Sequence, residues 1–404
     1  MNRIAVLMPG QGTQRQGMGR NLYESSDAAR MIFNKANDLL GYRFTEIIFN
    51  EKHEEIMDTK HVQMAIFLTS MAYYKEFIET KHIVPCCIAG HSIGEYAALT
   101  CAGVISFDDA LKLVEKRGTF MHDYFNAVEP GAMAAISGVS VKVLQEQCLI
   151  MNNKNKPVCI SNYNSDNEMV ISGLESNINE ISDILNTLGA SIKKLKVKTP
   201  FHSEYMQEAA DLMQQEIKNV KFLEPQFTVM SNLTGRPYTS NTEIKEMLAL
   251  QMVKPVLWNS IMENMLERGI DYFVEMGESH ILANLIRKKG YPSICARSLD
   301  TDLAKEEYQN DLRDNRHIGA NYKLKRMLGI AVSTKNKIQQ REEYEKYVIP
   351  EYNQIDTIRQ KVEKENRTAT INEVQEAYRH LVELLRLKQA PEEEVRRKLL
   401  ELEI

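Results

Sequence analysis

Residues 83–103 read IVPCCIAGHSIGEYAALTCAG, and this stretch decides the fold. An apolar run leads into a glycine-rich turn, and a helical pattern with many small residues follows the turn. The centre of the stretch, GHSIG (90–94), has the spacing G-x-S-x-G. Between a strand and a helix, this spacing predicts a nucleophile elbow, a strained turn that exposes the serine at the positive end of a helix. The sequence therefore predicts Ser92 as a nucleophile, with an ordinary tight turn as the alternative.

Strands and helices alternate on both sides of this elbow. RIAVLM (3–8) is typical of a buried strand and runs into a glycine turn. Helical patterns cover 27–40, 61–79 and most of 242–268, and strand patterns cover FTVMSN (227–232) and YFVEMG (272–277). Such alternation predicts a parallel sheet covered by helices.

Residues 128–198 have a different pattern of apolar residues. Their apolar pattern gives the order strand, helix, strand, strand, helix, strand, which is the order of a ferredoxin-like βαββαβ domain. We therefore predict an α/β-hydrolase-like core formed by residues 1–127 and 199–299, interrupted by a ferredoxin-like insertion at 128–198.

The composition changes again after residue 300. Asp, Glu, Lys and Arg make up 40 of the last 104 residues, against 65 of the first 300, so we predict a charged helical extension at 300–404. Thr370 and Glu373 have the spacing of a capping box at a helix start. Behind them an apolar stripe follows helical spacing; it comprises Val374, Tyr378, Leu381 and Leu385. Because such a helix is marginal by itself, we expect the catalytic body or a partner protein to cover the stripe, and the extension either docks the synthase or carrier or gives structural support.

The overall composition narrows the class of protein. Apolar residues make up 43% of the 404 residues and the net charge is −5, which is typical of a globular protein and argues against a nucleic-acid-binding surface. No apolar run is long enough to cross a bilayer, and the N-terminus lacks the pattern of a signal peptide, so we expect a cytoplasmic protein. The six cysteines are scattered without metal-ligand spacing, and we expect no metal site.

A serine nucleophile needs a base, and the chain has nine histidines. His91 lies inside the elbow. His202 lies in KTPFHS (198–203), where the chain would return from the predicted insertion. Spacing alone leaves this choice open.

Several ordered motifs together resemble the bacterial malonyl-CoA:acyl carrier protein transacylase family, especially the free-standing acyltransferases that serve polyketide synthases. The resemblance covers residues 3 to about 297. Besides Gln63 and Arg117, it rests on PGQGTQ (9–14), GHSIGEYAAL (90–99), GAMAAISG (131–138), NYNSDNEMVISG (162–173), PFHS (200–203), SNLTGRPY (231–238) and QMVKPVLW (251–258).

The resemblance implies a mechanism. Ser92 would hold the acyl group as an ester, with His202 as the base that takes and returns the proton. The backbone N–H groups of Gln11 and Ile93 would form the oxyanion hole, and a main-chain carbonyl near Gln251 would orient the histidine. Malonyl-CoA would load the serine, and the phosphopantetheine thiol of an acyl carrier protein would accept the malonyl group in a ping-pong cycle, with no bound cofactor.

The resemblance also implies how the substrate is recognised. Arg117 would bind the free carboxylate of malonate, because a guanidinium offers a planar fork to a carboxylate. Phe201 matches the bulky residue of malonyl-selective members, and Gln63 and Asn162 match supporting positions of the pocket. The sequence departs from the family at Glu278 and the serine after it, where a proline and a small residue are common.

Other functions compete with malonyl transfer. An acyl hydrolase could use the same elbow to clear carrier proteins, but it would gain nothing from a cation at Arg117 when its substrates are uncharged. A non-catalytic scaffold would not need both Ser92 and His202. Housekeeping fatty-acid synthesis and a polyketide pathway both fit the motifs, and the extension together with SNLTGRPY (231–238) favours polyketide synthesis, with a synthase as a further partner.

Overall fold

The computed structural model describes residues 4–50, 58–81, 84–126, 130–290, 294–299, 318–338, 340–365, 367 and 369–400. The chain forms two compact units. The first, here called the α/β unit, contains Ile4–Gly290 and, among the described residues that follow, Ala296–Leu299. The second, here called the helical unit, contains the C-terminal helices from Ile318 onward.

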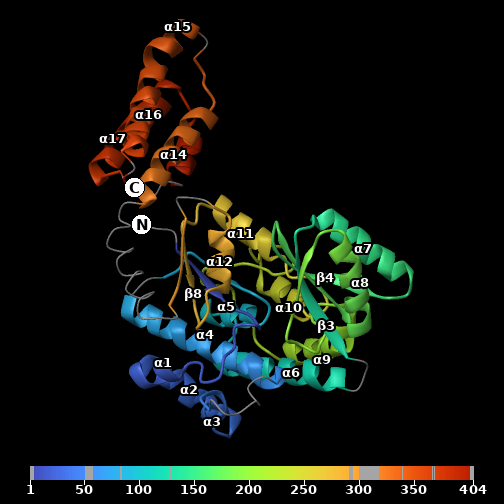
Figure 1. Ribbon diagram of the computed structural model, residues 1–404. Coiled ribbons are helices and arrows are strands. Elements are labelled where there is room, and N and C mark those ends of the chain that lie inside the picture. The colour runs from blue at the N-terminus through green and yellow to red at the C-terminus, as the bar shows by residue number, and fades with distance from the viewer. Residues whose placement is uncertain are drawn as a thin grey trace. The chain divides into compact units, whose positions relative to one another are not determined.

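A five-stranded sheet lies at the centre of the α/β unit (Figure 1). Its strands, in the order β7-β2-β1-β8-β9, are β7 (Thr228–Val229), β2 (Cys87–Gly90), β1 (Ile4–Met8), β8 (Tyr272–Glu275) and β9 (Cys295–Ser298). β1 pairs in parallel with β2 and β8, and β2 pairs in parallel with β7. Every residue of β1 is buried, which explains why its sequence is continuously apolar rather than alternating.

One predicted strand is much shorter than expected. The pattern FTVMSN (227–232) predicts six residues of strand, but β7 contains only two. The chain turns back directly afterwards, because the Ser231 amide donates to the Arg236 carbonyl oxygen. The Met230 amide still donates to the Ile88 carbonyl oxygen of β2, and from Ser231 onward hydrogen bonds of the turn replace the sheet ladder.

Helices surround the parallel sheet. They are α1 (Arg20–Ser25), α2 (Asp27–Leu40), α3 (Phe44–Ile48), α4 (Thr59–Lys81), α5 (Gly94–Cys101), α6 (Phe107–Asn126), η2 (Glu204–Met206), α9 (Gln207–Lys218), α10 (Asn241–Leu250), α11 (Trp258–Glu267) and α12 (Ile281–Arg287). The helical pattern at 242–268 divides into α10 and α11, and Gln251 lies at the end of α10, where the chain leaves the helix. Among the described residues, no helix is both long and apolar enough to span a membrane.

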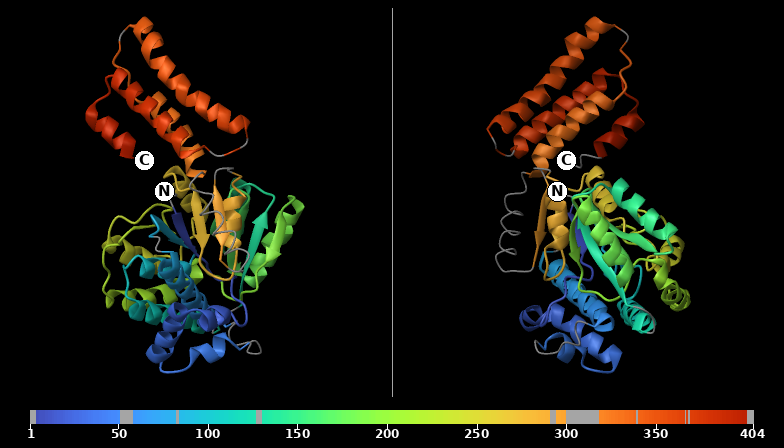
Figure 2. Two further views of the ribbon diagram at one scale, coloured as in Figure 1. Left: turned by 90° about the vertical axis from the view of Figure 1, so that its left-hand side faces the viewer. Right: turned by 45° about the vertical axis from the view of Figure 1, so that its right-hand side comes forward.

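A second, antiparallel sheet follows α6 in the chain. Its elements are β3 (Gly131–Ser137), α7 (Val141–Asn153), β4 (Val158–Ser165), β5 (Glu168–Leu174), α8 (Glu175–Thr187) and β6 (Ser191–Lys194), and its strand order is β4-β5-β3-β6. α7 and α8 pack against this sheet over a separate apolar core (Figure 2). The sheet is joined to the segment between α10 and α11, because Val256 exchanges backbone hydrogen bonds with Ser161 and Tyr163 of β4.

The helical unit has an apolar core of its own. Its elements are α14 (Ile318–Ser333), α15 (Arg341–Glu343), the π-helical turn η3 (Tyr344–Val348), α16 (Ile349–Lys364), α17 (Ile371–Leu387) and α18 (Glu392–Leu400). The capping box predicted at Thr370 and Glu373 is present at the start of α17.

The prediction of what covers the apolar stripe of α17 is wrong. We expected the body of the protein or a partner to cover it. Its residues are instead buried, or half-buried in the case of Tyr378, against side chains of α14 and α16 such as Leu324 and Ile355. The extension therefore supplies the second surface from its own sequence, and the stripe no longer argues for a docking role.

Candidate active site

The turn between β2 and α5 is strained at the serine. Ser92 has a φ of 52°, which a residue with a side chain rarely adopts. The glycines around it permit this geometry. A Cβ atom on Gly90 would lie 2.0 Å from the carbonyl carbon of Gly94, and one on Gly94 would lie 2.2 Å from the Met8 carbonyl oxygen. The local sequence therefore allows the elbow to form against β1, as its strand–turn–helix context predicts.

A buried histidine contacts the serine. The Ser92 Oγ lies 2.8 Å from His202 Nε2, and His202 Nδ1 lies 2.7 Å from the main-chain oxygen of Gln251. Because a carbonyl oxygen only accepts, Nδ1 carries the proton of the neutral ring, which leaves Nε2 free to accept from the serine. Burial and then the charge of Arg117 lower the pKa of His202 to about 3, so the ring is neutral near pH 7.

The glycine turn after β1 lies against the elbow. A Cβ atom on Gly10 would lie 2.5 Å from the His91 carbonyl oxygen, so only a glycine permits this close approach. This contact places the neighbouring Gln11 beside the serine turn. No hydrogen bond in the described part of the chain is donated by the amides of Gln11 or Ile93, and Ile93 directly precedes α5. Both amides are thus available to an oxyanion.

Arg117 brings a buried positive charge to the serine. Its guanidinium donates to Gln63 Oε1 at 2.5 Å, to Gln251 Oε1 at 3.0 Å and to Ser92 Oγ at 3.2 Å. Among the described residues, its Nε has no hydrogen-bond partner and no carboxylate forms an ion pair with the guanidinium. Burial lowers the pKa of Arg117, and the nearby side chains of Tyr96 and Glu95 oppose that shift. Such a cation is costly unless an anion joins it.

The remaining predicted site residues lie in two groups. Gln63 is buried and belongs to the cluster, since its Oε1 faces Arg117 while its Nε2 faces the Met121 sulfur. Phe201 is buried directly before His202 but has no polar group to bond. Asn162 is buried in the second sheet and accepts from the Ser161 hydroxyl at 2.8 Å. The structure therefore gives Phe201 and Asn162 no hydrogen bond to Ser92.

Three polar residues of the cluster received no role from the sequence. Glu95 is fully buried on α5, and its carboxylate accepts from the Asn232 amide at 2.8 Å and from the Tyr238 hydroxyl at 2.9 Å. Asn232 in turn accepts from the Ser92 amide at 2.8 Å. All three lie inside motifs that carry the family resemblance, and this is the feature of the sequence that could have identified them as site residues.

The departure from the family pattern at Glu278 creates a specific contact. The Glu278 side chain is only 2% exposed, and it accepts from Arg15 Nε at 2.7 Å and from the Gly19 amide at 3.0 Å. Ser279, the other departure, donates to the buried carboxylate of Glu275. Glu278 thus ties the segment that follows Gln11 to the turn after β8.

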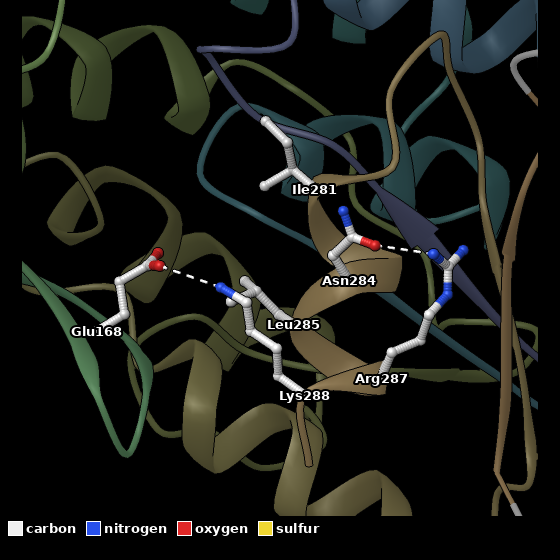
Figure 3. A pocket seen from close by; sticks show the side chains of 6 residues that line it. All are labelled: Glu168, Ile281, Asn284, Leu285, Arg287 and Lys288. Carbon is white, nitrogen blue, oxygen red and sulfur yellow. Dashed lines mark hydrogen bonds and ion pairs between the residues drawn. The ribbon is translucent and has the colours of Figure 1, made fainter. Parts of the chain in front are cut away.

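An open pocket of about 450 Å³ lies between α12 and the start of β5 (Figure 3). Lys288 reaches across it to Glu168 at 3.6 Å. A relay of hydrogen bonds connects this pocket to the elbow: Asn164 donates to Glu168 at 3.2 Å, and its Oδ1 lies 3.2 Å from His91 Nε2. Two hydrogen bonds therefore connect Glu168, which lines the pocket, to His91, the residue that precedes Ser92.

The parallel sheet, the elbow and the buried cation define the class of α/β acyltransferases. Comparison with known proteins agrees, since the family model "Acyl transferase domain" matches residues 6–325. A malonyl CoA-acyl carrier protein transacylase of Bacillus subtilis is 30% identical over 398 residues, 97% of this chain and 98% of that protein. A protein of the same name from Bacillus subtilis strain 168 is 36% identical over 289 residues, 71% of this chain and 90% of that protein.

Solved structures show the same likeness. A malonyl CoA-acyl carrier protein transacylase from Clostridium perfringens is 30% identical and superimposes with a TM-score of 0.73 over 78% of this chain and 98% of its own. A malonyl-transacylase in complex with its type II PKS acyl-carrier protein is 31% identical, with a TM-score of 0.71 over 75% of this chain and 97% of its own. The chain belongs to the malonyl CoA-acyl carrier protein transacylase family and is an acyltransferase.

Proposed function

We propose that this enzyme transfers malonyl from malonyl-CoA to the phosphopantetheine thiol of an acyl carrier protein through an ester on Ser92. The observation that carries the proposal is the buried Arg117, which lies 3.2 Å from the Ser92 oxygen and forms no ion pair within the described residues. A malonyl group brings a carboxylate a short distance from its thioester carbonyl. One substrate could therefore satisfy the cation and meet the nucleophile at once.

Each half of the cycle uses the same groups. Ser92 Oγ attacks the thioester carbonyl while His202 Nε2 takes its proton, and the amides of Gln11 and Ile93 stabilise the oxyanion. Collapse of the intermediate breaks the C–S bond, and His202 returns the proton to the CoA sulfur. In the second half the carrier thiol attacks the Ser92 ester, and the proton passes through His202 to the serine.

Two neutral groups fit supporting roles, the side chain of Gln63 and the main-chain carbonyl of Gln251. Gln63 Oε1 holds the guanidinium from the side away from Ser92, and the Gln251 carbonyl fixes the ring of His202. We assign Phe201 and Asn162 to the walls of the acyl pocket, because both are buried and both match pocket positions of the family resemblance. Phe201 also directly precedes His202. Such walls would select malonyl over bulkier acyl groups by shape.

The fold assignment is also part of the proposal. The antiparallel order β4-β5-β3-β6 supports a ferredoxin-like insertion at 128–198, and the parallel sheet with its elbow supports an α/β-hydrolase-like domain at 1–127 and 199–299. The helical unit supports a separate extension within 300–404.

We assign the carrier to polyketide synthesis because the chain carries a helical unit beyond its α/β unit, and because a solved relative binds a type II PKS acyl-carrier protein. A carrier of fatty-acid synthesis is the alternative. Loading rates on one carrier of each kind would decide between them, and equal rates would remove the polyketide assignment.

The test of the mechanism is Ser92→Ala, incubated with malonyl-CoA and followed by intact mass. We expect the wild type to gain one malonyl group and the variant to gain none, because no other group is placed to hold the ester. Ser203→Ala is the matched control, since the Ser203 hydroxyl is buried beside His202 but donates to the Pro200 carbonyl oxygen. A malonyl adduct on Ser92→Ala would refute the proposal. Rapid loss of the adduct to water, without transfer to a carrier, would instead support an acyl hydrolase.

A further inference from the structure

Glu95 is a fully buried carboxylate to which the catalytic cycle assigns no step. Three donors converge on it. The Asn232 amide and the Tyr238 hydroxyl donate to Oε1, and Gln251 Nε2 donates to Oε2 at 2.5 Å. Burial raises the pKa of Glu95 to about 7, and these donors oppose that rise. A carboxylate offers only acceptors when ionised, so it suits a site where every neighbour is a donor.

The contact with Gln251 fixes the direction of that side-chain amide. Its Nε2 end faces two acceptors, Glu95 and the Ser92 carbonyl oxygen at 2.9 Å. Its Oε1 end must then face the other way, where it accepts from Arg117 at 3.0 Å. If the amide were reversed, an N–H group would face the guanidinium, and both partners would be donors. The Glu95 carboxylate, by accepting from Gln251 Nε2, therefore keeps Gln251 Oε1 facing Arg117.

Glu95 also reaches the backbone of the nucleophile by two routes. Asn232, held by its amide, accepts from the Ser92 N–H at 2.8 Å, and Gln251 donates to the Ser92 carbonyl oxygen. Ser92 is the strained residue of the elbow, with a φ of 52°. Hydrogen bonds on both sides of a strained residue help to keep it in that conformation.

We propose that Glu95 is a positioning residue for acyl transfer: by fixing the direction of the Gln251 amide, it aims the Arg117 guanidinium at the carboxylate of a malonyl substrate. The inference rests on the proposed function, because it takes Ser92 as the acylated residue and Arg117 as the partner of malonate. It goes further by making malonyl preference depend on a carboxylate that touches neither the substrate nor Arg117.

The test is Glu95→Gln, which keeps the shape of the side chain but turns one oxygen into a donor. Whichever way the new amide lies, it places a donor against either Gln251 Nε2 or the Asn232 N–H. Loading is followed by intact mass with malonyl-CoA and with acetyl-CoA, which has no carboxylate. We expect the preference for malonyl over acetyl to fall by about tenfold or more, the size of one mismatched buried hydrogen bond.

The control is Glu275→Gln. Glu275 is equally buried, and burial raises its pKa to about 7 as well, but its carboxylate accepts from Ser279 and from the Ala283 amide at the start of α12. This variant should lower the melting temperature and leave the malonyl preference unchanged. A change of preference in Glu95→Gln that Glu275→Gln reproduces would overturn the inference, because buried carboxylates in general would then explain it.

A double-mutant cycle separates this role from plain support of the fold. In an Arg117→Ala background, Glu95→Gln should lower malonyl and acetyl loading by the same factor, because the group it aims is gone. A further selective loss of malonyl loading there would overturn the inference, as would an unchanged preference in Glu95→Gln alone. Failure of the proposed function has a different signature, namely an adduct that persists on Ser92→Ala.

Discussion

Two of the buried cations, Arg117 in the α/β unit and Lys388 in the helical unit, have different surroundings. In the helical unit, Lys388 is 3% exposed, and its ammonium group donates to the carbonyl oxygens of Ala331 and Thr334 at the end of α14. In the α/β unit, Arg117 is 2% exposed and also donates to neutral groups, but its Nε has no hydrogen-bond partner among the described residues. The Lys388 ammonium group thus stabilises the C-terminal end of a helix by binding its last carbonyl oxygens. A buried guanidinium with an unpaired N–H group beside a strained serine, as at Arg117 and Ser92, instead indicates a binding site.

The two Bacillus subtilis relatives differ in how much of this chain they match. The protein from Bacillus subtilis strain 168 matches 289 residues, and the match spans 90% of it, so little of that protein is left for a counterpart of the helical unit. The other Bacillus subtilis relative matches 97% of this chain. All of the proposed catalytic groups lie in the α/β unit, which is the part that both relatives can share.

Replacement of His202 should have the largest effect. His202→Ala removes the only base in contact with Ser92 among the described residues, and we expect malonyl loading to slow by roughly 10⁴-fold or more. The matched variant is His380→Ala in the helical unit, where the ring lies 2.6 Å from Glu351. Stopped-flow or quenched loading with malonyl-CoA measures both. Comparable losses in the two variants would contradict the assignment of chemistry to the α/β unit alone.

The two buried cations provide the next comparison. Arg117→Ala should cost malonyl loading about 3–5 kcal/mol, the penalty for leaving a buried charge without its partner, while acetyl loading changes much less. Lys388→Met should lower the melting temperature of the helical unit and leave both loading rates unchanged, because the two carbonyl oxygens that Lys388 contacts lie at the end of α14. If Arg117→Ala reduces both substrates equally, Arg117 is structural in the same sense as Lys388.

A core substitution in the helical unit should change stability without changing chemistry. Leu381 is fully buried in the core of α14, α16 and α17, so Leu381→Ala should cost about 2–5 kcal/mol of the free energy of unfolding of that unit. Val382→Ala, at a neighbouring position that is 39% exposed, is the control and should cost far less. Denaturant unfolding followed by circular dichroism gives the energies. A slower malonyl loading rate in folded Leu381→Ala would show that the two units are coupled.

Periodicity and the elbow motif predict most of the α/β unit, because its strands and helices have strong local patterns. β1 covers Ile4–Met8 of the predicted range 3–8, and β8 begins at Tyr272, where the predicted range 272–277 begins. β7 is the exception, since backbone hydrogen bonds of the turn at 231–236 override a good strand pattern. Such competition between a sheet and a turn is decided by tertiary contacts and leaves no trace in the local sequence.

The site is predicted only in part for a related reason. Ser92 stands out because glycines at fixed spacing are needed for its strained turn, and His202 stands out only through the family resemblance. Glu95 lies three residues from Ser92 and has no pattern of its own. Its role follows from the direction of hydrogen bonds that Gln251 and Asn232 bring from distant parts of the chain. The sequence shows which residues are present, but not which amide end faces which neighbour.

Removal of the helical unit should have the smallest effect of all. A chain that ends after Leu299 keeps β9 and every residue proposed to act on malonyl-CoA, so we expect it to load malonyl at the rate of the full-length enzyme. The apolar stripe of α17 is covered inside the helical unit, which removes the reason to expect that it covers the α/β unit or binds a carrier. Malonyl loading from CoA and transfer to a carrier are therefore measured separately, together with the melting temperature. If both rates and the melting temperature fall together, the helical unit stabilises the enzyme. If only transfer to the carrier falls, the helical unit contributes to carrier docking through a surface other than the stripe, and the division between a catalytic unit and a structural one must be abandoned.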